Sequence, residues 1–128
     1  MRWEVIDMLD CLAVGIGGFA GSILRYLMGM IPLKNRMSFP VNTLLINIAG
    51  AFLIGLIVAL FSKHGEWNDK LLLMLKVGLC GGFTTFSTFS FETLSLFQSG
   101  RWVSGILYAA LSVVLCVAAV YAGQLAAK

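Results

Sequence analysis

Residues 81–91 read GGFTTFSTFSF, a run that few ordinary transmembrane helices would contain. Its two adjacent glycines and five hydroxyl residues weaken a regular helix. Carbonyls freed by a helix break at membrane depth are tolerated only beside protein or a watery cavity. The run therefore predicts either a break that can bind a cation or a kinked helix whose hydroxyls bond back to their own backbone.

This run lies inside one of four apolar segments. Their approximate limits are residues 8–31, 39–61, 71–97 and 102–125. A helix needs about 20 predominantly apolar residues to cross a hydrocarbon core of about 30 Å, and each segment is long enough. The sequence predicts an all-α membrane protein of four transmembrane helices, with the third broken near its middle. A single transmembrane domain is expected to fill residues 1–128.

Composition excludes several other classes of protein. Hydrophobic residues make up 59% of the chain and charged residues 12%, and the mean hydropathy is +0.93, as expected for a chain in lipid. The cations are scattered, so we expect no nucleic-acid partner. The single histidine, His64, lies in a loop without a nucleophile and base to accompany it, so we expect no enzymatic activity. Cys11, Cys80 and Cys116 form no C-x-x-C pair, which argues against a zinc site or a disulfide framework.

The distribution of positive charge gives almost no orientation signal. Lys and Arg in short loops prefer the cytoplasm. The cations toward the face of the termini are Arg2, Lys63, Lys70, Lys76 and Lys128, and those toward the other face are Arg25, Lys34, Arg36 and Arg101. Either the weak charge bias is enough to select one orientation in the membrane, or the protein inserts in both orientations and pairs with an inverted copy of itself. We favour the second alternative, an antiparallel homodimer of dual topology.

The first apolar segment combines small residues with a charge. Gly17 and Gly21 form a G-x-x-x-G pair, which lets a neighbouring backbone approach closely in lipid. Arg25 follows one helical turn further along the same face. Its side chain either snorkels to a membrane surface or serves as a functional cation.

Polar stripes mark the second and fourth segments. Thr43, Asn47 and Gly50 follow helical spacing, and the Asn47 amide either joins two helices or donates to an anion. The fourth segment has a polar residue at every fourth position: Ser104, Tyr108, Ser112 and Cys116. Beside the hydroxyls of residues 81–91, this stripe is more typical of a pore wall than of a helix contact. The phenylalanines of that run either pack in the ordinary way or turn their electropositive ring edges toward an anion.

Three motifs make the chain similar to one known family along its whole length. They are Gly17-Gly18-Phe19-Ala20-Gly21-Ser22 with Arg25-Tyr26, Asn47-Ile48-Ala49-Gly50, and Gly81 through Ser90. In this order and spacing they resemble the Fluc family of fluoride channels, also called CrcB. The resemblance implies a passive, fluoride-selective channel that exports fluoride across the bacterial inner membrane. It further implies an antiparallel dimer with two pores and a structural sodium ion at its centre.

The same resemblance implies roles for individual residues. The ring edges of Phe86 and Phe89 would meet fluoride, and Asn47 would be a donor on the same pathway. The remaining polar track would consist of Ser87, Thr88, Tyr108 and Ser112, with Thr43 at its flank. Backbone carbonyls of Gly81 and Thr84 from both subunits would coordinate the sodium ion. Arg25 would make an aqueous vestibule positive, Glu92 would lie near a pore entrance, and Cys116 stands where a hydroxyl would be expected.

Two rival functions deserve comparison with this one. A proton-coupled exporter of the small multidrug resistance type also has four short spans, but it needs a carboxylate at membrane depth. Asp7 and Asp10 lie at the start of the first segment, and only Glu92 lies deeper. A noncatalytic packing subunit would need only the glycine motifs and would leave the polar stripes unexplained. The sequence therefore favours the channel.

Overall fold

The computed structural model describes residues 7–33 and 39–128, and this part of the chain contains helices and no strand. The first two spans are α1 (Met8–Gly29) and α2 (Val41–Lys63). The third consists of α3 (Asp69–Leu73), η1 (Met74–Cys80), α4 (Gly81–Phe83) and α5 (Phe86–Gln98), and the fourth is α6 (Trp102–Ala126). All four spans are long and apolar enough to cross a membrane, which confirms the predicted fold class. Three of the cations counted above, Arg2, Lys34 and Arg36, lie outside the described residues.

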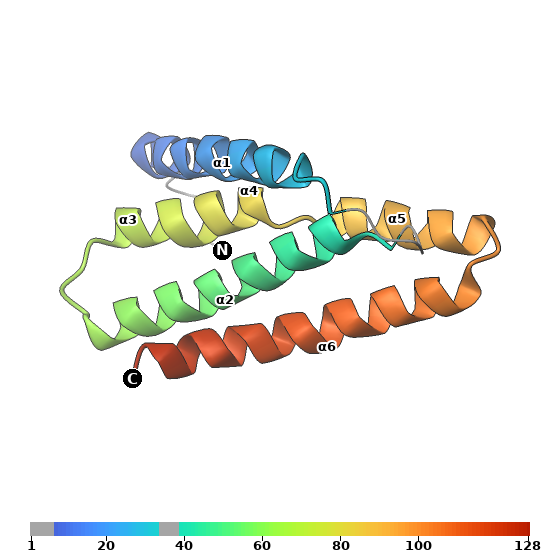
Figure 1. The fold of residues 1–128 in the computed structure, drawn as a ribbon. Helices are drawn as coiled ribbons and strands as arrows, with labels where there is room; N and C mark the ends of the chain where they lie inside the picture. Colours follow the sequence, from blue (N-terminus) through green and yellow to red (C-terminus); the bar gives the residue numbers. More distant parts are fainter. Residues whose placement is uncertain (1–6, 34–38) are drawn as a thin grey trace.

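Two close helix contacts hold the fold together (Figure 1). α2 packs along α6, and α1 packs against η1 and α4 in the first half of the third span. A Cβ on Gly17 or Gly21 would collide with the backbone of the third span, so only glycine permits this approach. Gly55 on α2 and Gly123 on α6 allow the same approach between those two helices. Close helix packing is therefore the role of the G-x-x-x-G pair.

The third span breaks at two consecutive threonines. Thr84 has φ −81° and ψ 158°, and Thr85 has φ −148° and ψ 111°, both extended conformations. The preceding segment η1 is a π-helix, a helix with wider turns than an α-helix. Such segments are rare in proteins as a whole but are often found at functional sites. The bent third span confirms the prediction made from residues 81–91.

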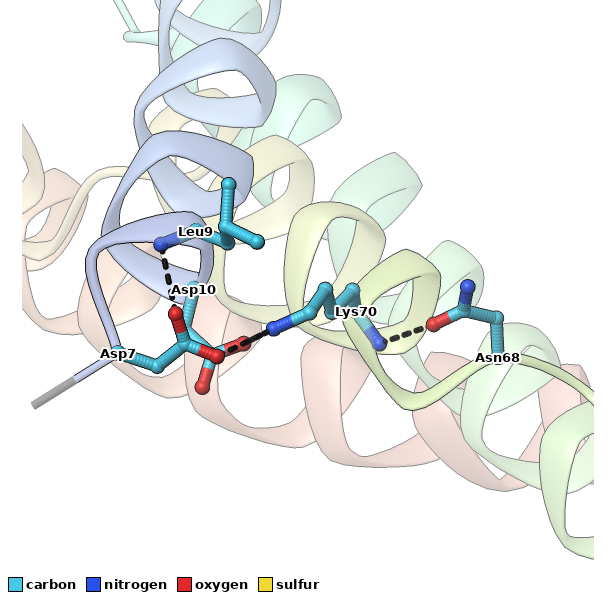
Figure 2. A network of polar contacts seen from close by, with 5 residues as sticks. All are labelled: Asp7, Leu9, Asp10, Asn68 and Lys70. Carbon is cyan, nitrogen blue, oxygen red and sulfur yellow. Dashed lines mark hydrogen bonds and ion pairs between the residues drawn. The ribbon is translucent and has the colours of Figure 1, made fainter. Parts of the chain in front are cut away.

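Lys70 joins the first turns of α1 and α3 (Figure 2). Its Nζ lies 2.6 Å from Asp7 Oδ2 and 2.7 Å from Asp10 Oδ1. Asp7 also caps α1, since its Oδ1 accepts the Leu9 N–H at 2.9 Å. Asn68 caps α3 by accepting the Lys70 N–H at 2.7 Å. The hydrogen bond from Lys70 holds the pKa of the Asp7 carboxyl below its ordinary value.

This ion pair predicts a small, pH-dependent contribution to stability. A carboxyl whose folded-state pKa is lowered stabilises the fold above its ordinary pKa of 3.8, and the contribution is lost as the pH falls through the lower value. We expect Lys70→Met to lower the thermal midpoint slightly at neutral pH and to converge with wild type only as the pH falls from 3.8 through the lowered pKa of Asp7. Both partners are partly exposed, so 1 M salt should shrink the difference. A midpoint difference that persists unchanged in acid would contradict this account.

Candidate functional site

Asn47 on α2 binds both backbone polar groups of Thr85. Its Oδ1 accepts the Thr85 N–H at 2.8 Å, and its Nδ2 donates to the Thr85 carbonyl at 3.2 Å. The first of these bonds replaces the backbone hydrogen bond that the Thr85 N–H loses at the break, and the second adds to the bond that the Thr85 carbonyl accepts as the cap of α5. The amide carries two hydrogens, and its contacts within the described chain use one of them. Asn47 thus joins two helices while keeping a second donor.

A side-chain cap begins α5 midway along the third span. Thr85 Oγ1 accepts the Thr88 N–H at 3.2 Å and donates to Thr88 Oγ1 at 3.0 Å. Ser87 Oγ lies 3.4 Å from the same Thr85 hydroxyl. The positive end of the α5 dipole therefore points at the break. Thr85 was not among the predicted site residues, although a hydroxyl three residues before Thr88 is a common capping signal.

Two carbonyls at the break lose the donors that a continuous helix would supply. The Gly81 carbonyl would accept from the Thr85 N–H, but that group is bound to Asn47. The Thr84 carbonyl would accept from the Thr88 N–H, but that group is bound to Thr85 Oγ1. Both carbonyls belong to residues that line one cavity, described below as the groove. They are hard oxygen atoms left for a ligand other than the helix itself.

Arg25 reaches the same break from α1. Its Nε donates to the Gly82 carbonyl at 3.0 Å, so the guanidinium satisfies one further carbonyl beside the break. Arg25 also lines a cavity of about 650 Å³ together with Thr43, Thr88 and Glu92. We call this space the vestibule cavity. A purely snorkelling arginine would make neither contact, so the side chain has a place in the site.

The groove is a second cavity, bounded by α2, the third span and α6. Its volume is about 470 Å³ and its walls are largely apolar. It brings together four of the predicted pathway residues, namely Asn47, Phe86, Phe89 and Ser112, and Cys116 lies on the same wall. The Ser112 Oγ is buried and has no hydrogen-bond partner among the described residues. A buried hydroxyl without a protein partner is uncommon, and a water molecule or an ion can supply the missing hydrogen bond.

The two phenylalanines of the groove differ in how firmly they are held. Their ring centroids lie 5.6 Å apart with an interplanar angle of 48°. Phe89 packs against the buried Tyr108, with centroids 5.2 Å apart, beside Leu44 and Leu96 in the core. Phe86 is 79% exposed in the single chain. Phe89 is thus fixed by packing in the core, whereas the ring of Phe86 is accessible from the groove.

Glu92 accepts hydrogen bonds from two hydroxyl groups that were predicted for the pathway. Thr43 Oγ1 donates to Glu92 Oε1 at 2.7 Å, and the Tyr108 hydroxyl donates to Oε2 at 2.8 Å. Tyr108 is completely buried and lines neither the groove nor the vestibule cavity, and Ser87 also lies outside both. The carboxylate, which lines the vestibule cavity, therefore binds both hydroxyls. Apart from Tyr108 and Ser87, the predicted site residues divide between two cavities that share only Thr85.

Comparison with known proteins places the chain in a family. The family described as CrcB-like protein, Camphor Resistance (CrcB), matches residues 12–124. A relative from Ruminiclostridium cellulolyticum, named fluoride-specific ion channel FluC, is 46% identical over 123 residues, which cover 95% of each chain. Relatives with the same name from Rhizobium etli and Shewanella denitrificans are 44% and 43% identical, each covering 91% of this chain and 94% of the relative.

These matches and the four spans agree with one another. They make the chain a multi-pass protein of the inner membrane and a transporter rather than an enzyme. The chain belongs to the CrcB family, the family of the fluoride-specific ion channels.

Proposed function

We propose that this protein is a passive, fluoride-selective channel that exports fluoride across the bacterial inner membrane. The groove carries the proposal, because Asn47, Phe86, Phe89 and Ser112 from three membrane-spanning helices all line this one cavity. Ser112 has a buried hydroxyl without a partner, and Asn47 has a second amide hydrogen. The names of the relatives support fluoride as the ion.

The donors of the groove suit conduction better than tight binding. A conducting site must replace part of the hydration shell of the ion without holding the ion too strongly. Asn47 and Ser112 supply neutral hydrogen-bond donors, and Phe86 and Phe89 supply ring edges of weak positive potential. Several weak sites in a narrow path favour the smallest halide while still releasing it.

Passive export is sufficient for a weak acid. Hydrogen fluoride crosses a bilayer as a neutral molecule and dissociates inside the cell, so an acidic environment loads the cell with fluoride ions. The negative interior of the cell then drives an anion outward through any selective pore. No coupled proton is needed, and Glu92 instead accepts hydroxyl hydrogen bonds from Thr43 and Tyr108.

A second copy of the chain completes the groove in this proposal. Phe86 is largely exposed, and the groove wall continues in apolar residues of α2 and α6 that include Ile54, Val113 and Val117. The near balance of cations on the two faces favours a partner in the inverted orientation. An antiparallel homodimer would then hold two equivalent pores, one for each groove.

The carbonyls of Gly81 and Thr84 would hold a structural sodium ion at the centre of that dimer. Both carbonyls lack their helical donors, as described above, and both residues line the groove that faces the partner. The ion would supply a fixed positive charge that joins the two broken helices. Asn47, Thr85 and Arg25 prepare its site, because their bonds hold the break open.

Flux from liposomes tests the proposed function. Purified protein should release fluoride down its gradient from vesicles clamped by a potassium ionophore, and chloride under the same conditions should stay inside. Chloride release at a comparable rate would contradict selectivity. Fluoride uptake driven by a proton gradient alone would favour the exporter. Labelling of single cysteines from both sides of the membrane tests dual topology, and labelling from one side only would reject it.

A further inference from the structure

A lysine shares the groove with the proposed fluoride pathway. Lys76 of η1 lines the same cavity as Asn47, Phe86, Phe89 and Ser112. Its side chain is exposed in the single chain. In the sequence alone, Lys76 is only one of the cations that bear on topology. Its position in the groove raises the question of what a charge does there.

Lys76 and Gly81 belong to the same half of the third span, and both line the groove. The third span therefore contributes both a lysine and the break to the wall of one cavity.

Lys76 forms no ion pair with any residue that the structure describes. An uncompensated charge within a span is costly unless it reaches an interface or meets an ion. Among the described residues that line the groove, Lys76 is the only one with a charged side chain.

Lys76 and Arg25 line different cavities. Along α1, Gly17 packs against η1 at Met74 and Gly78, close to Lys76 in the chain. Arg25 comes eight residues later, about 12 Å along the helix axis, and contacts Gly82. The groove that Lys76 lines and the vestibule cavity that Arg25 lines share only Thr85 among their described lining residues.

We propose that Lys76 is the cation that draws fluoride into the groove, while Arg25 lines the separate vestibule cavity. This role rests on the proposed function. A fixed positive charge raises the local concentration of anions at a cavity walled by low-dielectric residues. The neutral donors Asn47 and Ser112 and the ring edges of Phe86 and Phe89 are then left to select the ion.

Charge substitutions at Lys76 test this role. Lys76→Gln should lower fluoride efflux about three- to tenfold at an ionic strength of about 0.02 M, and the difference from wild type should shrink towards 1 M salt. Lys76→Arg should keep near wild-type flux, and Lys76→Glu should reduce flux further. Lys63→Gln is the matched control, because Lys63 lies at the end of α2 and lines a different cleft. It should leave flux unchanged.

The outcomes separate this role from the proposed function. Wild-type flux that does not distinguish fluoride from chloride overturns both. Selective wild-type flux that Lys76→Gln leaves unchanged at low salt overturns the role of Lys76 alone, since a snorkelling lysine would behave in that way. A loss that is the same at low and high salt, or that Lys76→Arg shares, would assign Lys76 a packing role and reject attraction. The salt dependence of wild-type flux is an independent measurement, because attraction requires that flux at low fluoride fall as salt rises.

Discussion

Replacing Asn47 by leucine should abolish fluoride flux and destabilise the fold by roughly 1–3 kcal/mol. The expected loss follows from the bond that Asn47 accepts from Thr85, because leucine would leave the backbone N–H of that residue unpaired at the break. Each unpaired buried group costs about 1–3 kcal/mol. The same substitution removes the amide hydrogen that is left for an anion. Thermal unfolding in detergent and liposome flux measure the two effects.

A second asparagine provides the control for this result. Asn68 also accepts a backbone N–H, at 2.7 Å from Lys70, but it lies in the exposed connection before α3 and outside the groove. Asn68→Ala should cost about 0.5–2 kcal/mol, as expected for the loss of a helix cap, and should leave flux intact. Asn47→Asp keeps an acceptor for the Thr85 N–H but adds a negative charge to the groove. Substantial fluoride flux through Asn47→Leu would remove Asn47 from the pathway.

Replacing Phe86 by isoleucine should suppress fluoride flux about tenfold or more while leaving assembly intact. Isoleucine keeps an apolar side chain but loses the electropositive ring edge, and a barrier increase of about 1.4 kcal/mol already gives a factor of ten. Because Phe86 is largely exposed in the single chain, its substitution should disturb the core little. Phe89→Ile should have a similar effect on flux with an added cost in stability, since Phe89 packs on Tyr108.

Phe91 is the matched control for Phe86. It lies on the same helix with a similar exposure of 72%, but it does not line the groove. Phe91→Ile should therefore conduct as wild type does. Equal losses of fluoride flux in Phe86→Ile and Phe91→Ile would point to a general effect on assembly. Unchanged flux in Phe86→Ile would count against the ring edge as a fluoride ligand. Size-exclusion profiles of all variants separate folding from conduction.

Much of the fold follows from the sequence because the membrane leaves few alternatives. Backbone groups in lipid must be satisfied within the chain, so an apolar segment long enough to cross has to be a helix. The break at Thr84 and Thr85 was also predictable, since glycines and hydroxyl residues weaken a helix in any surroundings. The π-helical turn of η1, against which Gly17 packs closely, was not predictable from the sequence.

The candidate site was predictable residue by residue only in part. Tyr108 and Ser112 lie one turn apart on the same polar stripe of α6, and the sequence treats them alike. In the structure the Tyr108 hydroxyl donates to Glu92, whereas the Ser112 hydroxyl is buried beside the groove without a partner. Helical periodicity shows which residues share a face, but the partner of each residue is supplied by another helix.

The sequence by itself determined that the protein crosses the membrane in four helices, that the third helix breaks, and which faces are polar. These properties depend on local composition and on the solvent. Only the tertiary structure decided that Asn47 binds Thr85, 38 positions away, that Arg25 meets Gly82, and that Lys76 shares a cavity with Phe86. Such contacts arise when helices distant in the chain pack together, and no local pattern encodes the residue that will lie opposite.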